Sequence, residues 1–525
     1  MCLWGQLNTM PSVSTKSSVS TNSTRVGEQV AARLVLVGAI LRVLSYHFSD
    51  NSGGDAGAHV ALAAVWLQHP TLKFVFDVYP PGHFWLIGLS TLAVHDVLTA
   101  GRLLSLVLGI ASLILVWKTA RLLYGMWAGL LSLGVFSLYS LHIGYSTTSS
   151  AEVSAVFFFL AGAYFFFRYF QTGDDKVWRL AISGACLSVA QSIRYEPWVL
   201  FGGLFVLLAI LLRVGPGRRP WGESLRSILV FGATGGIWPV FILSYAWHRF
   251  GNPLYLVNLN HLQAIKFIAA NPVSPIYQLA LPPSVLLLSL SPLAMVGAVY
   301  GLATSFSARL PSAFAGLTIL FGLFQAYEFC TGGMLAVARY TLIPGTMLAM
   351  VSGYGLQRIC EKLFRNRMGL AHSAVFGLLF LNMAAVLAMS ELPNRYAEKF
   401  ASISPRLRYQ ERIRLVGDYL RGHMGPDDAV VVDDYNVESG IIASVAGLPI
   451  IPGKRAYLLS KKNTVSVDDY INTEHPRFLV YAERGTLQQW FPLPPGCMGT
   501  EEIKGVRFHC VFANPTYRVY ELNYQ

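Results

Sequence analysis

The chain has 525 residues, of which 54% are hydrophobic and only 13% are charged. Soluble domains carry about 25% charged residues, so this composition excludes an ordinary soluble protein. The formal net charge is +12. The basic residues lie in short loops between apolar runs, a distribution that indicates a membrane protein and argues against a nucleic-acid-binding surface.

Apolar runs long enough to cross about 30 Å of hydrocarbon recur along the chain. Only helices and closed barrels satisfy every backbone group in lipid, so these runs predict a polytopic α-helical membrane protein. Residues 1–28 are rich in Ser and Thr and predict a disordered cytoplasmic tail. A membrane domain over 29–392 follows, with about 11 spans and a range of 10–13. The spans are expected at 30–48, 102–122, 128–145, 153–170, 177–193, 197–212, 227–247, 283–302, 313–329, 340–356 and 371–390.

The segment 82–98 is apolar enough either to span the membrane or to lie flat in its interface. Basic residues accumulate in cytoplasmic loops, and this rule separates the two alternatives. If the segment lies flat, the basic clusters all fall in cytoplasmic loops, whereas a span would place them alternately on both sides. We therefore expect one outer loop over 49–101 with interfacial helices. The short loops are typical of a prokaryotic plasma-membrane protein. The same charge rule places the N-terminus in the cytoplasm.

Two carboxylates lie in this outer loop, Asp55 in GGDAGAH and Asp77 in FDVYPPGHFW. Asp55 precedes an apolar stretch that can form an interfacial helix, so its carboxylate can simply cap that helix. The alternative is a general base that deprotonates an acceptor hydroxyl, and the position directly after the first span favours it. Asp77 is a possible second carboxylate that orients Asp55 or holds a metal, and it can equally be a solvated loop residue.

Four further charged residues are predicted on the same outer face. Glu152 follows TTSSA at the end of a span, where it can cap a helix or act as a second active-site carboxylate. Arg194 and Glu196 lie between two spans in SIRYEPW, and Arg339 opens a span in ARYTLIPG. Each arginine can form a structural ion pair or bind a phosphate. Ionisable groups gathered at one membrane face predict a functional site.

The histidines give only a weak indication of a metal site. His59, His83 and His261 are candidate ligands together with Asp77, but no pair of histidines has the i, i+4 spacing of a helical zinc site. Most interfacial histidines are amphipathic surface residues. No cofactor is assigned, and a divalent metal stays possible. The chain has no Walker loop and no glycine-rich dinucleotide motif in the required context, so a nucleotide-dependent mechanism finds no support.

Residues 393–525 differ in composition from the rest and predict a small extracytoplasmic α/β domain. Cys497 and Cys510 are its only cysteines. In an oxidising compartment they can form a disulfide, and the alternative is two free buried thiols. Helices are expected at 404–424 and 438–446, and strands at 429–433, 478–481 and 517–522.

Several motifs follow one another in an informative order. They are Gly54-Asp55-Ala56 after the first span, the Pro-Pro and aromatic motif that begins at Tyr79, AGRLLSLVLG with Arg102, YSTTSSAE with Glu152, SIRYEPW with Arg194, and ARY with Arg339 and Tyr340. Together they resemble GT-C fold membrane glycosyltransferases of the dolichyl-phosphate-mannose–protein mannosyltransferase and aminoarabinose-transferase type. The resemblance covers roughly residues 30–360. The chain departs from it where Tyr79 replaces a Lys and Ala56 replaces a second acid.

The resemblance implies transfer of a sugar from a polyprenyl-phosphate donor to an acceptor hydroxyl at the outer membrane face, with inversion. Asp55 would be the general base and Glu152 a second catalytic carboxylate. The donor phosphate would be bound by Arg194, Arg339, Tyr340, Tyr79 and Glu196. Membrane lipid and an acceptor glycan, lipid or protein would be the partners. The alternative is a transporter or lipid flippase, which predicts internal repeats and discontinuous helices near the bilayer midplane. We see no clear repeat between the halves.

Overall fold

The structure is a computed structural model, and it describes most of the chain. The described residues are 21–49, 55–72, 79–171, 176–214, 219–270, 272, 274–335, 337–364, 368–389, 409–433, 439–448, 455–458, 467–483, 485–493, 496–497 and 499–524. Residues 1–20 of the predicted tail and the candidate carboxylate Asp77 lie outside these ranges. The rest of the predicted tail, 21–28, belongs to the helix α1 (Thr21–Phe48), and the predicted tail stays a prediction.

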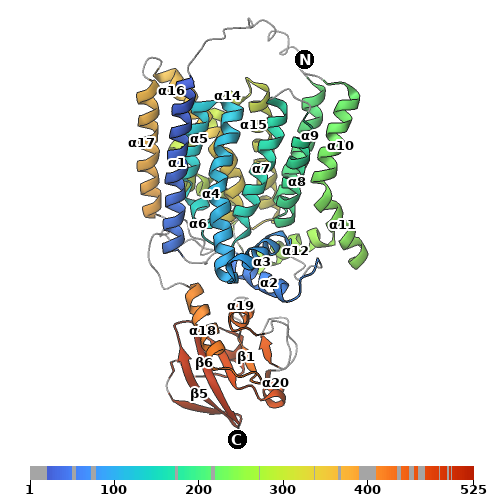
Figure 1. The fold of residues 1–525 in the computed structure, drawn as a ribbon, viewed down its shortest axis with the longest axis vertical. Coiled ribbons are helices and arrows are strands. Elements are labelled where there is room, and N and C mark those ends of the chain that lie inside the picture. Colours follow the sequence, from blue (N-terminus) through green and yellow to red (C-terminus); the bar gives the residue numbers. More distant parts are fainter. Residues whose placement is uncertain are drawn as a thin grey trace, which may run out of the picture.

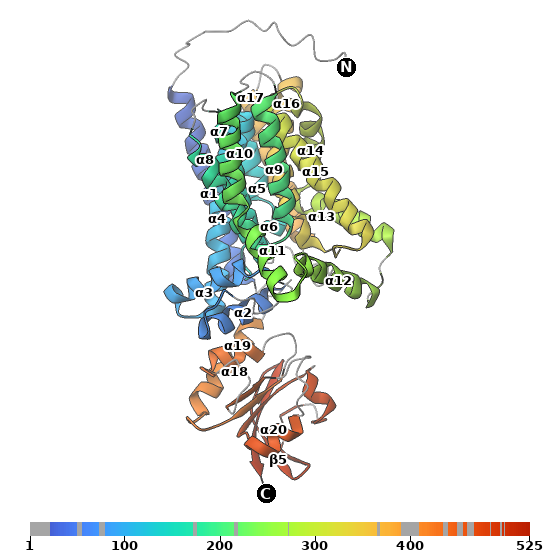
Figure 2. The same ribbon diagram turned by 90° about the vertical axis from the view of Figure 1, so that its right-hand side faces the viewer.

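The membrane domain is a bundle of helices that run side by side in Figures 1 and 2. Among the described residues, five helices are long and apolar enough to cross a membrane, or up to seven if each of two bent pairs forms one span. The five are α1 (Thr21–Phe48), α4 (Val97–Tyr124), α7 (Ala151–Gln171), α9 (Glu196–Arg213) and α15 (Arg309–Thr331). The other bundle helices are α5 (Met126–Ser137), α6 (Ser140–Tyr145), α8 (Trp178–Ile193), α16 (Leu342–Leu363) and α17 (Met368–Met389). The polytopic helical fold is confirmed, and the number of spans stays a prediction.

Three predicted spans are interrupted. The segment 227–247 divides into α10 (Trp221–Gly235) and α11 (Ile237–Phe250), bent by 53°, and 283–302 divides into α13 (Pro275–Leu290) and α14 (Pro292–Ser305), bent by 111°. The segment 128–145 divides into α5 and α6. The prediction of one helix over 283–302 is wrong because Pro292 cannot donate a backbone hydrogen bond and Ser291 has a φ of 85°, which a helix cannot accommodate.

Two short helices lie across one end of the bundle (Figure 1). They are α2 (Ala56–Gln68) and α3 (Gly82–Val94), with 13 residues each. A helix of this length extends about 20 Å, too little to cross the hydrocarbon core. The chain turns at His95, whose φ is 60°, and α4 begins directly afterwards. These lengths fit the predicted interfacial position of 82–98. A further helix, α12 (Tyr255–Ala270), lies near the same end.

The C-terminal domain is built on one six-stranded sheet with the strand order β2-β1-β3-β6-β5-β4. Strands β2, β1 and β3 are parallel, and β6, β5 and β4 continue the sheet in antiparallel pairing. The bounds are β1 (Val430–Val432), β2 (Ala456–Leu458), β3 (Phe478–Ala482), β4 (Thr500–Ile503), β5 (Val506–Ala513) and β6 (Tyr517–Tyr524), with helices α18 (Tyr409–His423), α19 (Ser439–Val445) and α20 (Val467–Glu474). The predicted α/β domain is confirmed.

This domain packs against the short helices α2 and α3. Helices α2 and α19 are in contact, and Gln68 at the end of α2 donates a hydrogen bond to the carbonyl of Leu448 at 3.0 Å. Arg414 on α18 forms an ion pair with Asp96, the residue that caps α4. Apolar residues of α2, α3, α18 and α19 share one buried cluster.

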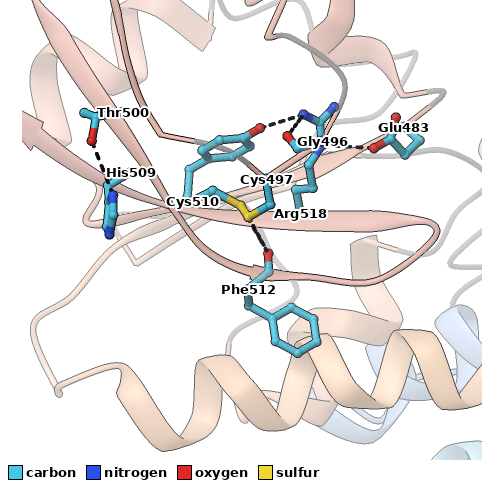
Figure 3. Close-up of a disulfide and its surroundings, with 9 residues drawn as sticks. Glu483, Gly496, Cys497, Thr500, His509, Cys510, Phe512 and Arg518 are labelled. Atoms are coloured by element: carbon cyan, nitrogen blue, oxygen red, sulfur yellow. Dashed lines mark hydrogen bonds and ion pairs between the residues drawn. A yellow bond between two sulfur atoms is a disulfide. The ribbon is translucent and has the colours of Figure 1, made fainter.

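Cys497 and Cys510 form a disulfide that attaches a loop to β5 (Figure 3). The buried Arg518 lies beside it, between Glu483 at 3.0 Å and the carbonyl of Gly496 at 3.0 Å. The disulfide and the arginine therefore hold the same loop to the sheet from two sides.

Candidate functional site

Asp55 precedes α2, but its carboxylate makes no capping hydrogen bond with that helix. The carboxylate instead faces Arg339, with 2.9 Å between Oδ2 and Nη1, and it accepts a hydrogen bond from Tyr79. Burial alone would raise the pKa of Asp55. The Arg339 guanidinium, with help from His59 and the Tyr79 hydroxyl, outweighs it and holds the pKa below its ordinary value. Asp55 is therefore an ionised carboxylate at neutral pH, held by a cation from another part of the chain.

Glu152 lies in the first turn of α7 and is 4% exposed. Its Oε1 accepts a hydrogen bond from Nη1 of Arg194 and lies 3.9 Å from Nε of Arg339. Its Oε2 is buried and has no hydrogen-bond partner among the described residues. Glu152 therefore contacts both arginines and presents an oxygen that a polar substrate group could satisfy.

Arg194 follows α8 with extended backbone, and it is the centre of a dense ion-pair cluster. Its Nε and Nη2 bond Glu196, at distances between 2.6 and 3.1 Å, while Nη1 bonds Glu152. Every nitrogen of this guanidinium already faces a carboxylate. A phosphate can reach Arg194 only if one of these carboxylates gives way.

Arg339 and Tyr340 lie on η1 (Ala338–Thr341), a single 3-10 turn in front of α16. The Tyr340 ring lies between the two arginines, with centroid distances of 5.0 Å to the guanidinium carbon of Arg194 and 5.5 Å to that of Arg339. A cation over an aromatic face is stabilised by the ring quadrupole. Tyr340 therefore joins the two cationic groups without adding a charge.

His59 and His83 lie behind Asp55 as a pair of buried rings with centroids 5.0 Å apart. Burial lowers the pKa of His59 to about 4 and that of His83 to about 3, so both imidazoles are neutral at pH 7. His83 Nε2 lies 2.9 Å from the carbonyl of Ser149, in the loop that leads to Glu152. The Tyr79 ring packs edge-on against His59. The two rings therefore link α2 and α3, and His83 also links α3 to the loop before Glu152.

Of the metal candidates, His59 and His83 are neighbours, His261 lies on a different helix, α12, and Asp77 lies outside the described residues. Among the described residues, no group of three or more His, Cys, Asp or Glu side chains could hold a metal ion. His261 lies on α12 beside Glu328, at 4.0 Å, and Asp55 and Glu152 face arginines. The described side chains do not fit a metal, and the divalent metal considered above stays a prediction.

One supporting residue received no role in the sequence prediction. Arg102 on α4 is 4% exposed and donates to the carbonyls of Thr147 and Tyr46, each at 2.7 Å. It joins the end of α1 to the loop before Glu152. An arginine inside an apolar run, as in AGRLLSLVLG, is the signal that identifies such a residue, because a buried guanidinium must find acceptors.

The cluster as a whole is polar, partly buried and short of positive charge. Three carboxylates (Asp55, Glu152 and Glu196) face two guanidinium groups (Arg194 and Arg339). These residues come from the starts and ends of different helices, all at the end of the bundle that carries α2 and α3. Such a site can accept a proton on a carboxylate and stabilise a developing anion with an arginine.

Comparison with known proteins supports a common architecture. A family model described as Dolichyl-phosphate-mannose-protein mannosyltransferase matches residues 78–242. ArnT from Cupriavidus metallidurans, in its structure bound to undecaprenyl phosphate, aligns with a TM-score of 0.61 at 14% identity over 93% of this chain and 98% of its own. The chain has the GT-C fold.

A second GT-C fold structure gives the same result. The oligosaccharyltransferase AglB from Archaeoglobus fulgidus, in complex with an inhibitory peptide and a dolichol-phosphate, aligns with a TM-score of 0.54 at 13% identity over 88% of this chain and 70% of its own. No curated protein sequence matches the chain. The predicted resemblance to GT-C membrane glycosyltransferases is confirmed. A transporter is also expected to have bent helices, and this chain has two bent helix pairs among its described residues. These bends occur within a GT-C fold.

Proposed function

We propose that this protein transfers a sugar from a polyprenyl-phosphate donor to an acceptor hydroxyl at the outer membrane face, with Asp55 as the general base. The observation that carries the proposal is the environment of the Asp55 carboxylate. It does not cap α2 but faces Arg339 and Tyr79 inside a partly buried ionic cluster. A carboxylate serving only as a helix cap would need none of these partners. The GT-C fold and the match to a mannosyltransferase family model support the same reaction class.

The proposed reaction is a direct displacement at the anomeric carbon. The acceptor oxygen forms a bond to that carbon, its proton passes to Asp55, and the bond from the carbon to the phosphate oxygen breaks. The electron pair leaves with the polyprenyl phosphate. Attack from the face opposite the leaving group inverts the anomeric configuration. The leaving phosphate gains negative charge, so a cation beside it lowers the barrier.

Arg339 is the proposed partner of this phosphate, and Asp55 is its partner before the donor binds. If the phosphate draws Arg339 away, Asp55 loses the cation that lowers its pKa and becomes a stronger base. The donor then activates the base at the moment when it is needed. Arg194, with Tyr340, Tyr79 and Glu196, holds the surrounding charges in place. Glu152 is the second carboxylate, and its buried Oε2 is available to a sugar hydroxyl.

The acceptor is proposed to reach the site from the side of the C-terminal domain. That domain contacts α2, the helix that begins after Asp55, and bonds its far end at Gln68. Its proposed role is to cover the site or to guide an acceptor glycan, lipid or protein. The proposal places the N-terminus in the cytoplasm and the C-terminal domain outside a prokaryotic plasma membrane.

The test is reconstitution of the purified protein in liposomes with a panel of radiolabelled polyprenyl-phosphate sugars. We expect release of polyprenyl phosphate and transfer or hydrolysis of one sugar, with inverted anomeric configuration by NMR of the early product. Movement of an intact donor or solute across the vesicle membrane without cleavage would overturn the proposal and favour the transporter or flippase. Retention of configuration would overturn the direct displacement.

A further inference from the structure

The turn that carries Arg339 and Tyr340 has a backbone group that its own helix cannot satisfy. The sequence is ARYTLIPG, and α16 begins at Leu342. An α-helical turn would satisfy the carbonyl of Tyr340 with the N–H of residue 344. That residue is Pro344, which has no N–H. The carbonyl of Tyr340 therefore needs a donor from elsewhere.

Gln325 supplies that donor. It lies on α15, is 4% exposed, and its Nε2 donates to the carbonyl of Tyr340 at 2.8 Å. The neighbouring carbonyl of Thr341 accepts a hydrogen bond from the hydroxyl of Tyr139 at 3.2 Å. A Cβ on Gly345 would lie 2.2 Å from the Tyr139 hydroxyl oxygen, so only glycine allows this approach. Two buried side chains, one on α15 and one in the link between α5 and α6, thus hold the turn.

The chain uses the same arrangement a second time. Pro239 on α11 removes the donor for the carbonyl of Gly235, at the bend between α10 and α11. Gln191 on α8 is buried and donates its Nε2 to that carbonyl at 3.2 Å. In both places a proline removes a backbone donor and a glutamine from a neighbouring helix replaces it. The repetition indicates that the Gln325 contact meets a definite backbone need.

We propose that Gln325 is a positioning residue, which fixes the 3-10 turn so that Arg339 meets Asp55 and the Tyr340 ring meets both arginines. The proposal rests on the proposed function for its catalytic meaning. The path is short: Gln325 bonds the Tyr340 carbonyl, Arg339 is the preceding residue, and its guanidinium lies 2.9 Å from Asp55. Without the amide donor, a buried carbonyl would be left unsatisfied, and the turn would rotate to reach another donor.

The test is Gln325→Leu, which keeps the side-chain volume close to that of glutamine and removes the donor. We expect kcat to fall by on the order of 10-fold or more, as for a small displacement of a catalytic pair. The acid limb of the kcat/KM profile, which reports the donor-free enzyme, should move to higher pH, because Asp55 loses part of the attraction from Arg339. A general loss of packing would lower the amount of active protein without moving that limb.

Two further variants make the test specific. Pro344→Ala restores an N–H four residues after Tyr340, so the double variant Pro344→Ala/Gln325→Leu should recover much of the lost kcat and the original acid limb. Gln191→Leu is the matched control, because it removes the same kind of glutamine-to-carbonyl hydrogen bond at Gly235. The backbone at Gly235 carries no residue of the candidate site. Gln191→Leu should leave the acid limb in place. An unshifted limb in Gln325→Leu, or no rescue by Pro344→Ala, would overturn the proposal.

A structural measurement separates this proposal from the proposed function. Cryo-electron microscopy of Gln325→Leu in lipid nanodiscs should show the Arg339 guanidinium displaced from Asp55, whether or not a donor has been identified. An unchanged Arg339–Asp55 pair in that structure would overturn the positioning role. Failure of the wild-type protein to cleave any polyprenyl-phosphate sugar would instead overturn the proposed function, and the structural comparison would still decide the role of Gln325.

Discussion

Replacing Asp55 with Asn tests the centre of the proposed mechanism. Asn has the same shape and can still accept the Tyr79 hydrogen bond, but it cannot take up the acceptor proton. A positioned general base contributes about 10²- to 10⁴-fold to a rate, or about 3–5 kcal/mol of barrier. We therefore expect kcat of Asp55→Asn to fall by at least about 100-fold.

The effect on stability should be much smaller. The Asp55–Arg339 pair is only partly buried, with side-chain exposures of 28% and 11%, and Arg339 keeps Glu152 nearby at 3.9 Å. Loss of the charge on Asp55 should cost about 1 kcal/mol of unfolding free energy, between the values for an exposed and a buried pair. The expected rise in the activation free energy, about 3–5 kcal/mol, is thus several times larger than the expected loss of unfolding free energy, about 1 kcal/mol.

The assay is donor cleavage by proteoliposomes, with thermal unfolding of the same preparations measured in parallel. Asp96→Asn is the matched control, because Asp96 lies near the same end of the bundle and pairs with Arg414. Asn also keeps the ability to cap α4. The reasoning is refuted if Asp55→Asn retains activity within a few-fold of wild type. It is also refuted if both variants lose activity equally.

Three other changes probe the same structure. Arg339→Met removes the cation that lowers the pKa of Asp55 in the donor-free enzyme. A carboxylate acts as a base only above its pKa, so the acid limb of kcat/KM, which reports the free enzyme, should move to higher pH, and a limb that stays in place would contradict the pairing. Glu152→Gln removes a buried charge from the ionic cluster and should lower the unfolding free energy by about 2–3 kcal/mol, as measured by thermal unfolding; an unchanged melting temperature would argue against a buried pair. Replacing Cys497 or Cys510 with Ser should cost about 3 kcal/mol in the C-terminal domain, since the bridge closes a 13-residue separation. Limited proteolysis of the full-length protein checks this, and equal cleavage rates with and without the bridge would contradict it.

Local pattern was enough to predict several features of this protein. Apolar runs predicted a polytopic helical protein because lipid accepts few other backbone arrangements. The position of basic loops favoured an interfacial 82–98, and α3 is too short to span. The acids and arginines at helix ends were recognisable because a charge next to a bilayer needs a chemical reason.

Only the tertiary structure decided which of these groups meet. Asp55 pairs with Arg339 rather than capping α2, and Glu152 pairs with Arg194. No local pattern encodes such partners, because their distance in space depends on how the helices pack. The bend at Ser291 also escaped prediction, since apolar composition continues across it.

The contribution of Gln325 shows the same limit most clearly. The missing N–H of Pro344 can be read directly from ARYTLIPG, so the sequence by itself determined that one carbonyl would need a donor. Which side chain provides it depends on the packing of α15 beside the 3-10 turn. Sequence thus specified the needs of the backbone and the charges at the membrane surface. Packing decided how those needs were met, because a hydrogen bond or an ion pair requires contact within a few ångströms.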